Sequence, residues 1–190
     1  MPKEHIPIAV DTVDIEKNRW IKLVVENEMR LVRLYLENKE SCYDKAERNA
    51  WIVKTLVDKK QRYRFKECKN VVMVGSGIYP YSMFDLHKQY PHINQVGLEI
   101  EENRAMLSRR LISSSPAKNS INIITCDAIN YDYSWLESED FVFISVDVEG
   151  DKIFSKVLKT SKAQPLVCAP YKYTWLANLI KSNNVMSVKA

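Results

Sequence analysis

Glycine is scarce in this sequence: there are four in 190 residues, and none lies in the first 74 positions. Because glycine permits positive φ angles and close backbone approach, we expect the few present to mark turns or ligand contacts. Cysteine is equally sparse, and the four cysteines (Cys42, Cys68, Cys126 and Cys168) form no C-x-x-C pair and have no histidine nearby. This pattern disfavours a zinc site or a disulfide framework. It predicts reduced, buried thiols and no metal.

Long apolar runs are also missing. No run approaches the roughly 18 apolar residues of a membrane span, and Met1–Val10 holds two prolines and an acid where a signal peptide needs an apolar core. A composition of 46% hydrophobic and 27% charged residues is typical of a globular domain rather than a disordered chain. We therefore expect a cytoplasmic protein without a membrane partner. The sequence is compatible with a homodimer.

The net charge of +4 is too small to indicate a polyanionic partner by itself, but its distribution is uneven. The run Lys59–Lys69 holds six basic residues against one acid. Such a run is usually the solvated end of a helix. The alternative is a contact with a phosphate or an acidic substrate.

The pattern of apolar residues divides the chain near residue 67 into a helical segment (1–66) and a second domain (67–190). Apolar residues recur at three- and four-residue spacing over 14–38 and 43–64, which predicts two amphipathic helices. Beyond residue 67, short apolar runs alternate with helical stretches, which predicts an α/β fold with a parallel sheet. The expected strands are Asn70–Val74, Gln95–Ile100, Ile121–Cys126, Phe141–Val146 and Pro165–Ala169.

Three of these strands end in residues suited to binding a nucleoside. The first runs into the turn Gly75-Ser76-Gly77, where a ligand can approach the backbone closely. The second ends at Glu99, followed by Ile100, and this carboxylate can accept both hydroxyls of a ribose. The third ends at Asp127, followed by Ala128, and this acid can accept from the exocyclic amine of adenine or can simply cap a turn. Ligands of open α/β sheets gather at these carboxyl ends.

The succession V-G-S-G, G-L-E-I-E, C-D-A and an apolar fourth strand ending at Asp147 resembles the class I S-adenosylmethionine (SAM) methyltransferase fold over roughly residues 67 to 182. Within that superfamily the chain resembles nicotianamine synthase and related small SAM enzymes. The G-S-G-x-x-P turn of that family occurs here as residues 75–80, and its fourth strand, glycine loop and lysine-containing helix resemble residues 143–152. The resemblance implies a Rossmann-like sheet flanked by helices and SAM as co-substrate.

One departure from ordinary methyltransferases bears on the reaction. The acid that usually stands two residues before the first glycine is replaced by Met73, as in nicotianamine synthase, which also has an apolar residue there. Either other residues hold the aminobutyrate arm of SAM, as transfer of that arm would require, or a backbone carbonyl replaces the acid in a plain methyltransferase.

The fold is expected to be shortened at its C-terminus. A helix over Lys172–Lys181 leaves only Ser182–Ala190, which is too little for the usual final hairpin, although Val185–Val188 can add an edge strand. We therefore expect the helical segment to close over the ligand as a lid.

One carboxylate interrupts the apolar face of the first predicted helix. Glu28 falls within the arc of apolar residues, where an unpaired charge is costly to bury. It should meet a cation or line the active site. Nicotianamine synthase uses a glutamate from its helical half on the substrate amine, although the two helical halves do not align securely.

The chemistry on SAM is modest, because its sulfonium already activates the adjoining carbons. The enzyme must hold an amine in line, exclude water and accept a proton. We expect Glu28, then Asp147, to hold that proton, with the Tyr171 hydroxyl as a positioning group. Aromatic rings can stabilise the sulfonium. The candidates lie at or just after strand ends: Tyr79, Tyr81, Tyr171 and Tyr173.

Three SAM-dependent reactions fit the resemblance. The first is transfer of the 3-amino-3-carboxypropyl arm to a small-molecule amine, and the second is closure of that arm on its own amine to azetidine-2-carboxylate. Both release methylthioadenosine. The third, methyl transfer, releases adenosylhomocysteine. An RNA methyltransferase that uses the basic run is disfavoured, because an N/D-P-P-Y-type motif is absent. A nucleoside sensor without turnover is a further alternative.

Overall fold

The computed structural model describes residues 22, 26, 28–30, 32, 33, 65–145 and 150–167. Residues 28–30, 32 and 33 are helical, as expected for the N-terminal segment. The remaining described residues form five strands and three longer helices. In chain order these are β1 (Asn70–Val74), α4 (Tyr81–Gln89), β2 (Asn94–Glu99), α5 (Glu102–Ser113), β3 (Ile121–Thr125), β4 (Phe141–Ile144), α6 (Gly150–Thr160) and β5 (Gln164–Val167).

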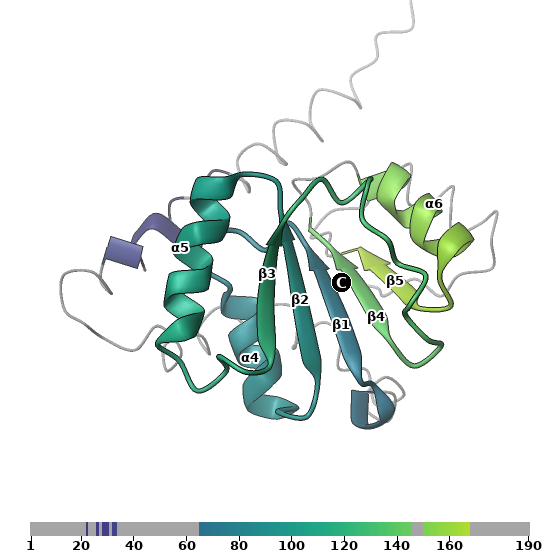
Figure 1. Cartoon of the computed structure of the whole chain (residues 1–190), viewed down its shortest axis with the longest axis horizontal. Helices are drawn as coiled ribbons and strands as arrows, with labels where there is room; N and C mark the ends of the chain where they lie inside the picture. Colours follow the sequence, from purple (N-terminus) through teal and green to yellow (C-terminus); the bar gives the residue numbers. More distant parts are fainter. Residues whose placement is uncertain are drawn as a thin grey trace, which may run out of the picture.

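The strands form one parallel sheet in the order β3-β2-β1-β4-β5, and their arrowheads lie together at the upper edge in Figure 1. This confirms the predicted parallel α/β sheet, with strand ends shifted by at most two residues where they can be compared. The chain runs outward from β1 to β3 and then returns to the other side of β1 as β4. The order of the strands therefore reverses between β1 and β4, the position where open α/β sheets form a ligand crevice.

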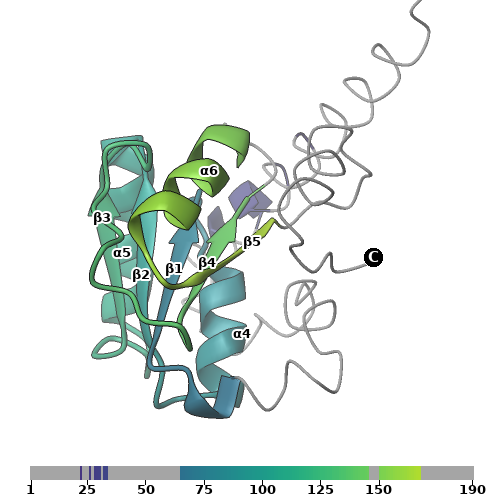
Figure 2. The same cartoon turned by 90° about the vertical axis from the view of Figure 1, so that its right-hand side faces the viewer.

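Both faces of the sheet are covered, which explains why the central strands are almost continuously apolar. Helices α4 and α5 pack on one face, where Met83, Phe84, Leu111 and Ile112 join the core. Helix α6 and the loop after β3 cover the other face. Figure 2 shows α4 and α6 on opposite sides of the sheet.

Phe65 belongs to the core of the sheet domain, although it precedes the boundary expected near residue 67. It is only 2% exposed. Its ring stacks on Phe141 with 4.7 Å between centroids, and on Tyr90 at 5.5 Å. Val32 of the N-terminal segment is buried in the same apolar cluster. The two parts of the chain therefore share a core.

Gly97 lies in the middle of β2 because the neighbouring atoms leave no room for a side chain. A Cβ at this position would lie 2.4 Å from Cδ1 of Ile123 and 2.9 Å from Cβ of Ser76. This close approach brings Ser76, in the turn after β1, directly against β2. The glycine thus helps to set the distance between the turn and the end of β2.

Several expectations fall outside the described residues. They concern most of the helix over 14–38, the helix over 43–64, Lys59–Arg64 of the basic run, the end of the fourth strand with Asp147, and everything after residue 167, including Tyr171 and Tyr173. None of the described helices is long and apolar enough to cross a membrane.

Candidate functional site

The turn after β1 has the backbone conformation that its glycines allow. Gly75 and Gly77 have φ angles of 73° and 74°, in the left-handed region that other residues rarely adopt. The N–H groups of Gly75 and Ser76 both donate to the carbonyl of Leu98, at 2.9 and 3.1 Å. These bonds hold the turn against the end of β2.

Glu99 ends β2 directly beside this turn. Its carboxylate is only 4% exposed. Oε2 accepts from the N–H of Gly77 at 3.0 Å, and Oε1 accepts from the N–H of Glu101 at 3.2 Å. A carboxylate has about four acceptor positions, so these two bonds fix its orientation and leave capacity for further donors such as ribose hydroxyls.

Glu28 reaches the same turn from the N-terminal segment. It is 5% exposed, and its Oε2 accepts from the N–H of Ile78 at 3.3 Å. A Cβ placed on Gly77 would lie 2.4 Å from Oε1 of Glu28, so the carboxylate sits where any larger residue would collide with it. Two carboxylates from distant parts of the sequence therefore flank one glycine turn.

Arg104 joins the two carboxylates and was not predicted from the sequence. Its Nη2 lies 3.7 Å from Oε2 of Glu28, and its Nε lies 3.7 Å from Oε2 of Glu99. At this distance one ion pair gains roughly 4 kcal/mol in the effective dielectric of a protein surface. That gain is comparable with the several kcal/mol that burial of one ion costs. The sequence did contain an indication of this role. Arg104 lies in the first turn of a helix, where the helix dipole disfavours a cation, so an arginine there suggests nearby negative charge.

Two polar atoms of this cluster are buried without a hydrogen bond. Within the described part of the chain, neither Ser76 Oγ nor Arg104 Nε has a hydrogen-bond partner. Buried polar groups are normally satisfied by protein or bound molecules. These two unpartnered atoms beside the turn are therefore candidates for contacts with a polar ligand at the end of β1.

Asp127 and Ala128 follow β3 in a braced loop. Oδ1 of Asp127 accepts from the N–H of Ile129 at 2.9 Å, and Oδ2 accepts from Nδ2 of Asn130 at 3.4 Å. This is the turn-capping role that the sequence left as an alternative. The hydroxyl of Tyr133 donates to the carbonyl of Ala128 at 3.0 Å, which holds the loop in place.

The loop is also tied to neighbouring elements. Cys126 N–H donates to the carbonyl of Glu99 at 3.0 Å, so the ends of β2 and β3 are joined. Lys156 of α6 donates to the carbonyl of Ile129, and its ammonium lies 5.8 Å from the centre of the Tyr133 ring. The backbone beside Ala128 is therefore held from two sides.

The expected aromatic and apolar contacts differ in exposure. Tyr79 is fully buried, with its ring 6.1 Å from Phe84 and 6.2 Å from Tyr81. Its ring is therefore part of the core rather than of an open surface. Tyr81 is only half-buried, and Ile100 is 67% exposed at the end of β2. Tyr81 and Ile100 remain accessible to a ligand.

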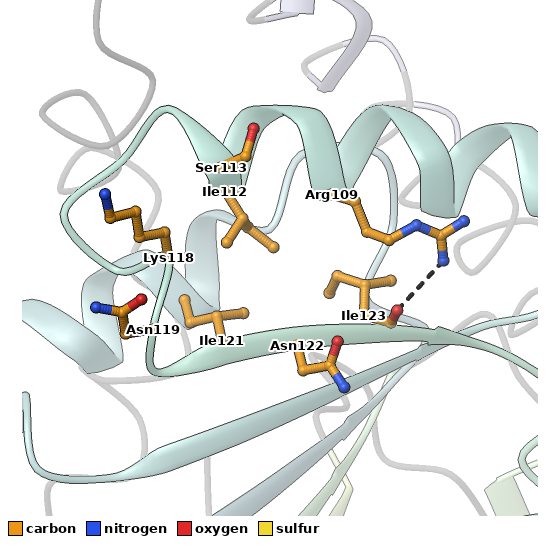
Figure 3. Close-up of a pocket in the computed structure, with 8 residues that line it drawn as sticks. All are labelled: Arg109, Ile112, Ser113, Lys118, Asn119, Ile121, Asn122 and Ile123. Atoms are coloured by element: carbon orange, nitrogen blue, oxygen red, sulfur yellow. Dashed lines mark hydrogen bonds between the residues drawn. The ribbon is translucent and has the colours of Figure 1, made fainter.

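A separate groove of about 230 Å³ lies between the C-terminal half of α5 and β3. Figure 3 shows its apolar floor of Ile112, Ile121 and Ile123, with Arg109 and Lys118 at its two ends. Arg109 donates to the carbonyl of Ile123 and to the hydroxyl of Thr125, so it covers the outer edge of β3. The groove faces the side of the sheet and not the crevice at the strand ends.

Among the described residues, no three His, Cys, Asp or Glu side chains are arranged to hold a metal ion. Asp147, predicted to hold the proton, and Tyr171, predicted to position the substrate, lie outside these residues, and so do Cys42 and Cys168. Cys68 is fully buried. Burial, assisted by the charge of Asp140, raises the pKa of its thiol to about 12.

Solved structures share the fold of this chain. A nicotianamine synthase mutant determined in complex with S-adenosylmethionine matches with a TM-score of 0.60 and 19% identity, over 80% of this chain and 59% of that one. A protein from Methanococcus maripaludis, designated an S-adenosyl-L-methionine-dependent methyltransferase, matches with a TM-score of 0.52 and 11% identity, over 84% of this chain and 72% of that one. The chain has the class I SAM-dependent methyltransferase fold.

At these identities the likeness establishes the fold alone. The chain spans 59% of the length of the nicotianamine synthase structure that it matches. No model of a protein family matches the sequence, and no curated protein matches it. In this chain, Glu99 and Glu28 both contact the turn after β1, at the carboxyl ends of the parallel strands.

Proposed function

We propose that this protein is a SAM-dependent transferase that moves or cyclises the 3-amino-3-carboxypropyl arm of SAM and releases methylthioadenosine. The observation that carries the proposal is the Glu28 carboxylate, held over Gly77 at the end of β1. A carboxylate in this place can receive a proton from an amine that reacts with the arm. The acceptor would be a small-molecule amine or the amine of the arm itself.

The charges around the turn support this proposal. Glu28, Glu99 and Arg104 together carry one net negative charge, which complements the sulfonium of SAM. The N–H groups of Gly77 and Ile78 already donate to Glu99 and Glu28. The carboxylate of the aminobutyrate arm would therefore need other donors.

In the proposed reaction the acceptor nitrogen attacks the γ-carbon of the arm. A nitrogen–carbon bond forms as the bond between the γ-carbon and sulfur breaks, and its electron pair stays on sulfur. The sulfonium becomes the neutral thioether of methylthioadenosine, while the nitrogen gives up its proton to Glu28. When the nitrogen is the α-amine of the arm itself, the product is the four-membered ring of azetidine-2-carboxylate.

Methyl transfer is the second candidate, because a protein designated a methyltransferase shares the fold. Position 73, where ordinary methyltransferases carry an acid, is a buried methionine here. In a methyltransferase, Glu28 would replace that acid and hold the ammonium of SAM, so its position alone serves both reactions. The two differ in which group leaves SAM.

The experiment that separates them is incubation of the full chain with methyl-labelled SAM, followed by chromatography of the nucleoside product. We expect the label to remain in methylthioadenosine. Adenosylhomocysteine together with a labelled acceptor would establish methyl transfer instead. Tight binding of SAM with neither product would make the protein a sensor.

A further inference from the structure

Arg104 occupies a position that is unfavourable for a cation. It is the third residue of α5, near the helix N-terminus, where the helix dipole favours negative charge. Its side chain is 25% exposed, whereas the side chains of Glu28 and Glu99 that it faces are 6% and 5% exposed. The two carboxylates must therefore compensate for the placement of the guanidinium.

The three charged groups form a chain across two parts of the molecule. Glu28 and Glu99 accept from neighbouring N–H groups of the same turn, so the two negative charges lie close together. Like charges in such a site repel, and the repulsion is strong where water is excluded. The one cation that the described residues place between them is Arg104, at 3.7 Å from an oxygen of each.

We propose that Arg104 is the positioning residue that holds the Glu28 carboxylate against Gly77, with Glu99 as its second anchor. The inference rests on the proposed function, in which Glu28 receives the proton, and on the sequence-based expectation that Glu99 binds the ribose. Through Arg104, the strand end that binds the nucleoside also determines where the carboxylate of the N-terminal segment lies. Arg104 itself acts through these two residues and takes no part in the bond changes.

The contacts of Arg104 predict how substitutions behave. Both are ion pairs at 3.7 Å, and Nε makes no hydrogen bond within the described residues. The position of the Glu28 carboxylate is therefore set by the charge of Arg104 rather than by a bidentate pair of hydrogen bonds. A lysine should replace much of this effect, although at a true bidentate site it would not.

The first test needs no ligand. Urea unfolding of the full chain is compared for wild type, Arg104→Gln, Glu28→Gln and the double variant, which forms a double-mutant cycle. We expect the two destabilising effects to be non-additive. The urea midpoint of the double variant should then be close to that of the less stable single variant. Strictly additive shifts would show that Arg104 does not hold Glu28, whatever the reaction is.

The second test is turnover of SAM by the same variants. We expect Arg104→Gln to lower kcat about 10- to 100-fold, the loss caused by a misplaced group, with a smaller change in KM. The kcat of the double variant should lie within about threefold of the kcat of Glu28→Gln. Arg104→Lys should restore most of kcat, and Arg110→Gln, exposed on the same helix, should match wild type.

The outcomes separate the two proposals. Two results would overturn the role of Arg104 while leaving the proposed reaction intact. One is an Arg104→Gln variant in which only KM changes; the other is a double variant whose loss of kcat equals the product of the two single losses. If wild type neither binds nor converts SAM, the proposed function fails, and the unfolding cycle still decides whether Arg104 positions Glu28.

Discussion

Single residues at the end of β2 combine structure with ligand binding. Glu99 accepts from Gly77 and Glu101, so the same carboxylate that is suited to a ribose also fixes the glycine turn. A substitution here must therefore change both ligand affinity and the local backbone. Its neighbour Glu101 is exposed and contributes only its N–H to this arrangement.

We predict that Glu99→Ala weakens binding of both SAM and methylthioadenosine by about 1.5–3 kcal/mol, the range for a hydrogen bond to a charged group. Isothermal titration calorimetry measures this directly. Glu101→Gln is the matched control and should bind as wild type does. Unchanged affinity in a folded Glu99→Ala variant would remove Glu99 from the ligand site.

The buried thiol of Cys68 makes a second residue-scale prediction. Its pKa rises from 9.0 to about 12 on folding because burial, and then the charge of Asp140, disfavour the thiolate. Above its unfolded pKa the unfolded chain loses this proton while the folded chain keeps it. The free energy of unfolding therefore falls as pH rises from about 9 towards 12, by roughly 1.4 kcal/mol per pH unit.

Urea unfolding at about pH 8.5 and about pH 10.5 tests this effect. We expect wild type to lose about 2 kcal/mol more than Cys68→Ala over this interval. Burial also raises the pKa of Tyr133, so both proteins should lose some stability. Equal losses in the two proteins would show that the thiol ionises freely in the folded state.

At the scale of elements, Asp140 links the beginnings of three strands. It is 2% exposed and lies just before β4. Its carboxylate accepts from the backbone N–H and side-chain amide of Asn70, at 2.8 and 3.1 Å, and from the N–H groups of Lys69 and Glu137. Its carbonyl accepts from the N–H of Gln164 at 3.0 Å. The starts of β1, β4 and β5 thus converge on one residue.

We predict that Asp140→Ala lowers the free energy of unfolding by about 2–4 kcal/mol, because several buried donors lose their acceptor. Asp140→Asn should cost less, since one oxygen remains. The exposed neighbour provides the control: Glu139→Ala should stay within about 0.5 kcal/mol of wild type. Chemical denaturation measures all three, and a small loss in Asp140→Ala would mean that water replaces the carboxylate.

At the scale of the whole molecule, the N-terminal segment contributes to both the core and the site. Val32 is buried with the residues of α4 and α5, and Glu28 reaches the glycine turn. Phe65 stacks within the sheet domain and must remain in any truncated form. These contacts support the proposal that the segment closes over the ligand as a lid.

We predict that removal of residues 1–60, which keeps Phe65, leaves a folded sheet domain without turnover, because Glu28 and the proposed lid are lost. Circular dichroism checks folding, and chromatography of the nucleoside product checks activity. Glu28→Gln in the full chain shows how much of the loss comes from one carboxylate. Normal turnover by the truncated protein would reduce the segment to a structural cap.

Much of the fold follows from local patterns in the sequence. All five strands were predicted because β-branched and aromatic runs bounded by turn residues indicate strands over short distances. The glycine turn, Glu99 and Asp127 could be placed at one edge because parallel strands share their carboxyl ends. This step needs neither the strand order nor the side-chain contacts.

Which side chains meet was decided by tertiary packing. Helical periodicity singled out Glu28 but could not identify Arg104 as its partner, since it does not specify which helices face each other. The burial of Tyr79 and the role of Asp140 depend likewise on contacts between distant segments. The sequence by itself determined the strands and the polar residues at their ends. The tertiary structure alone decided the Glu28–Arg104–Glu99 cluster, because an ion pair between segments exists only once both are packed against the same turn.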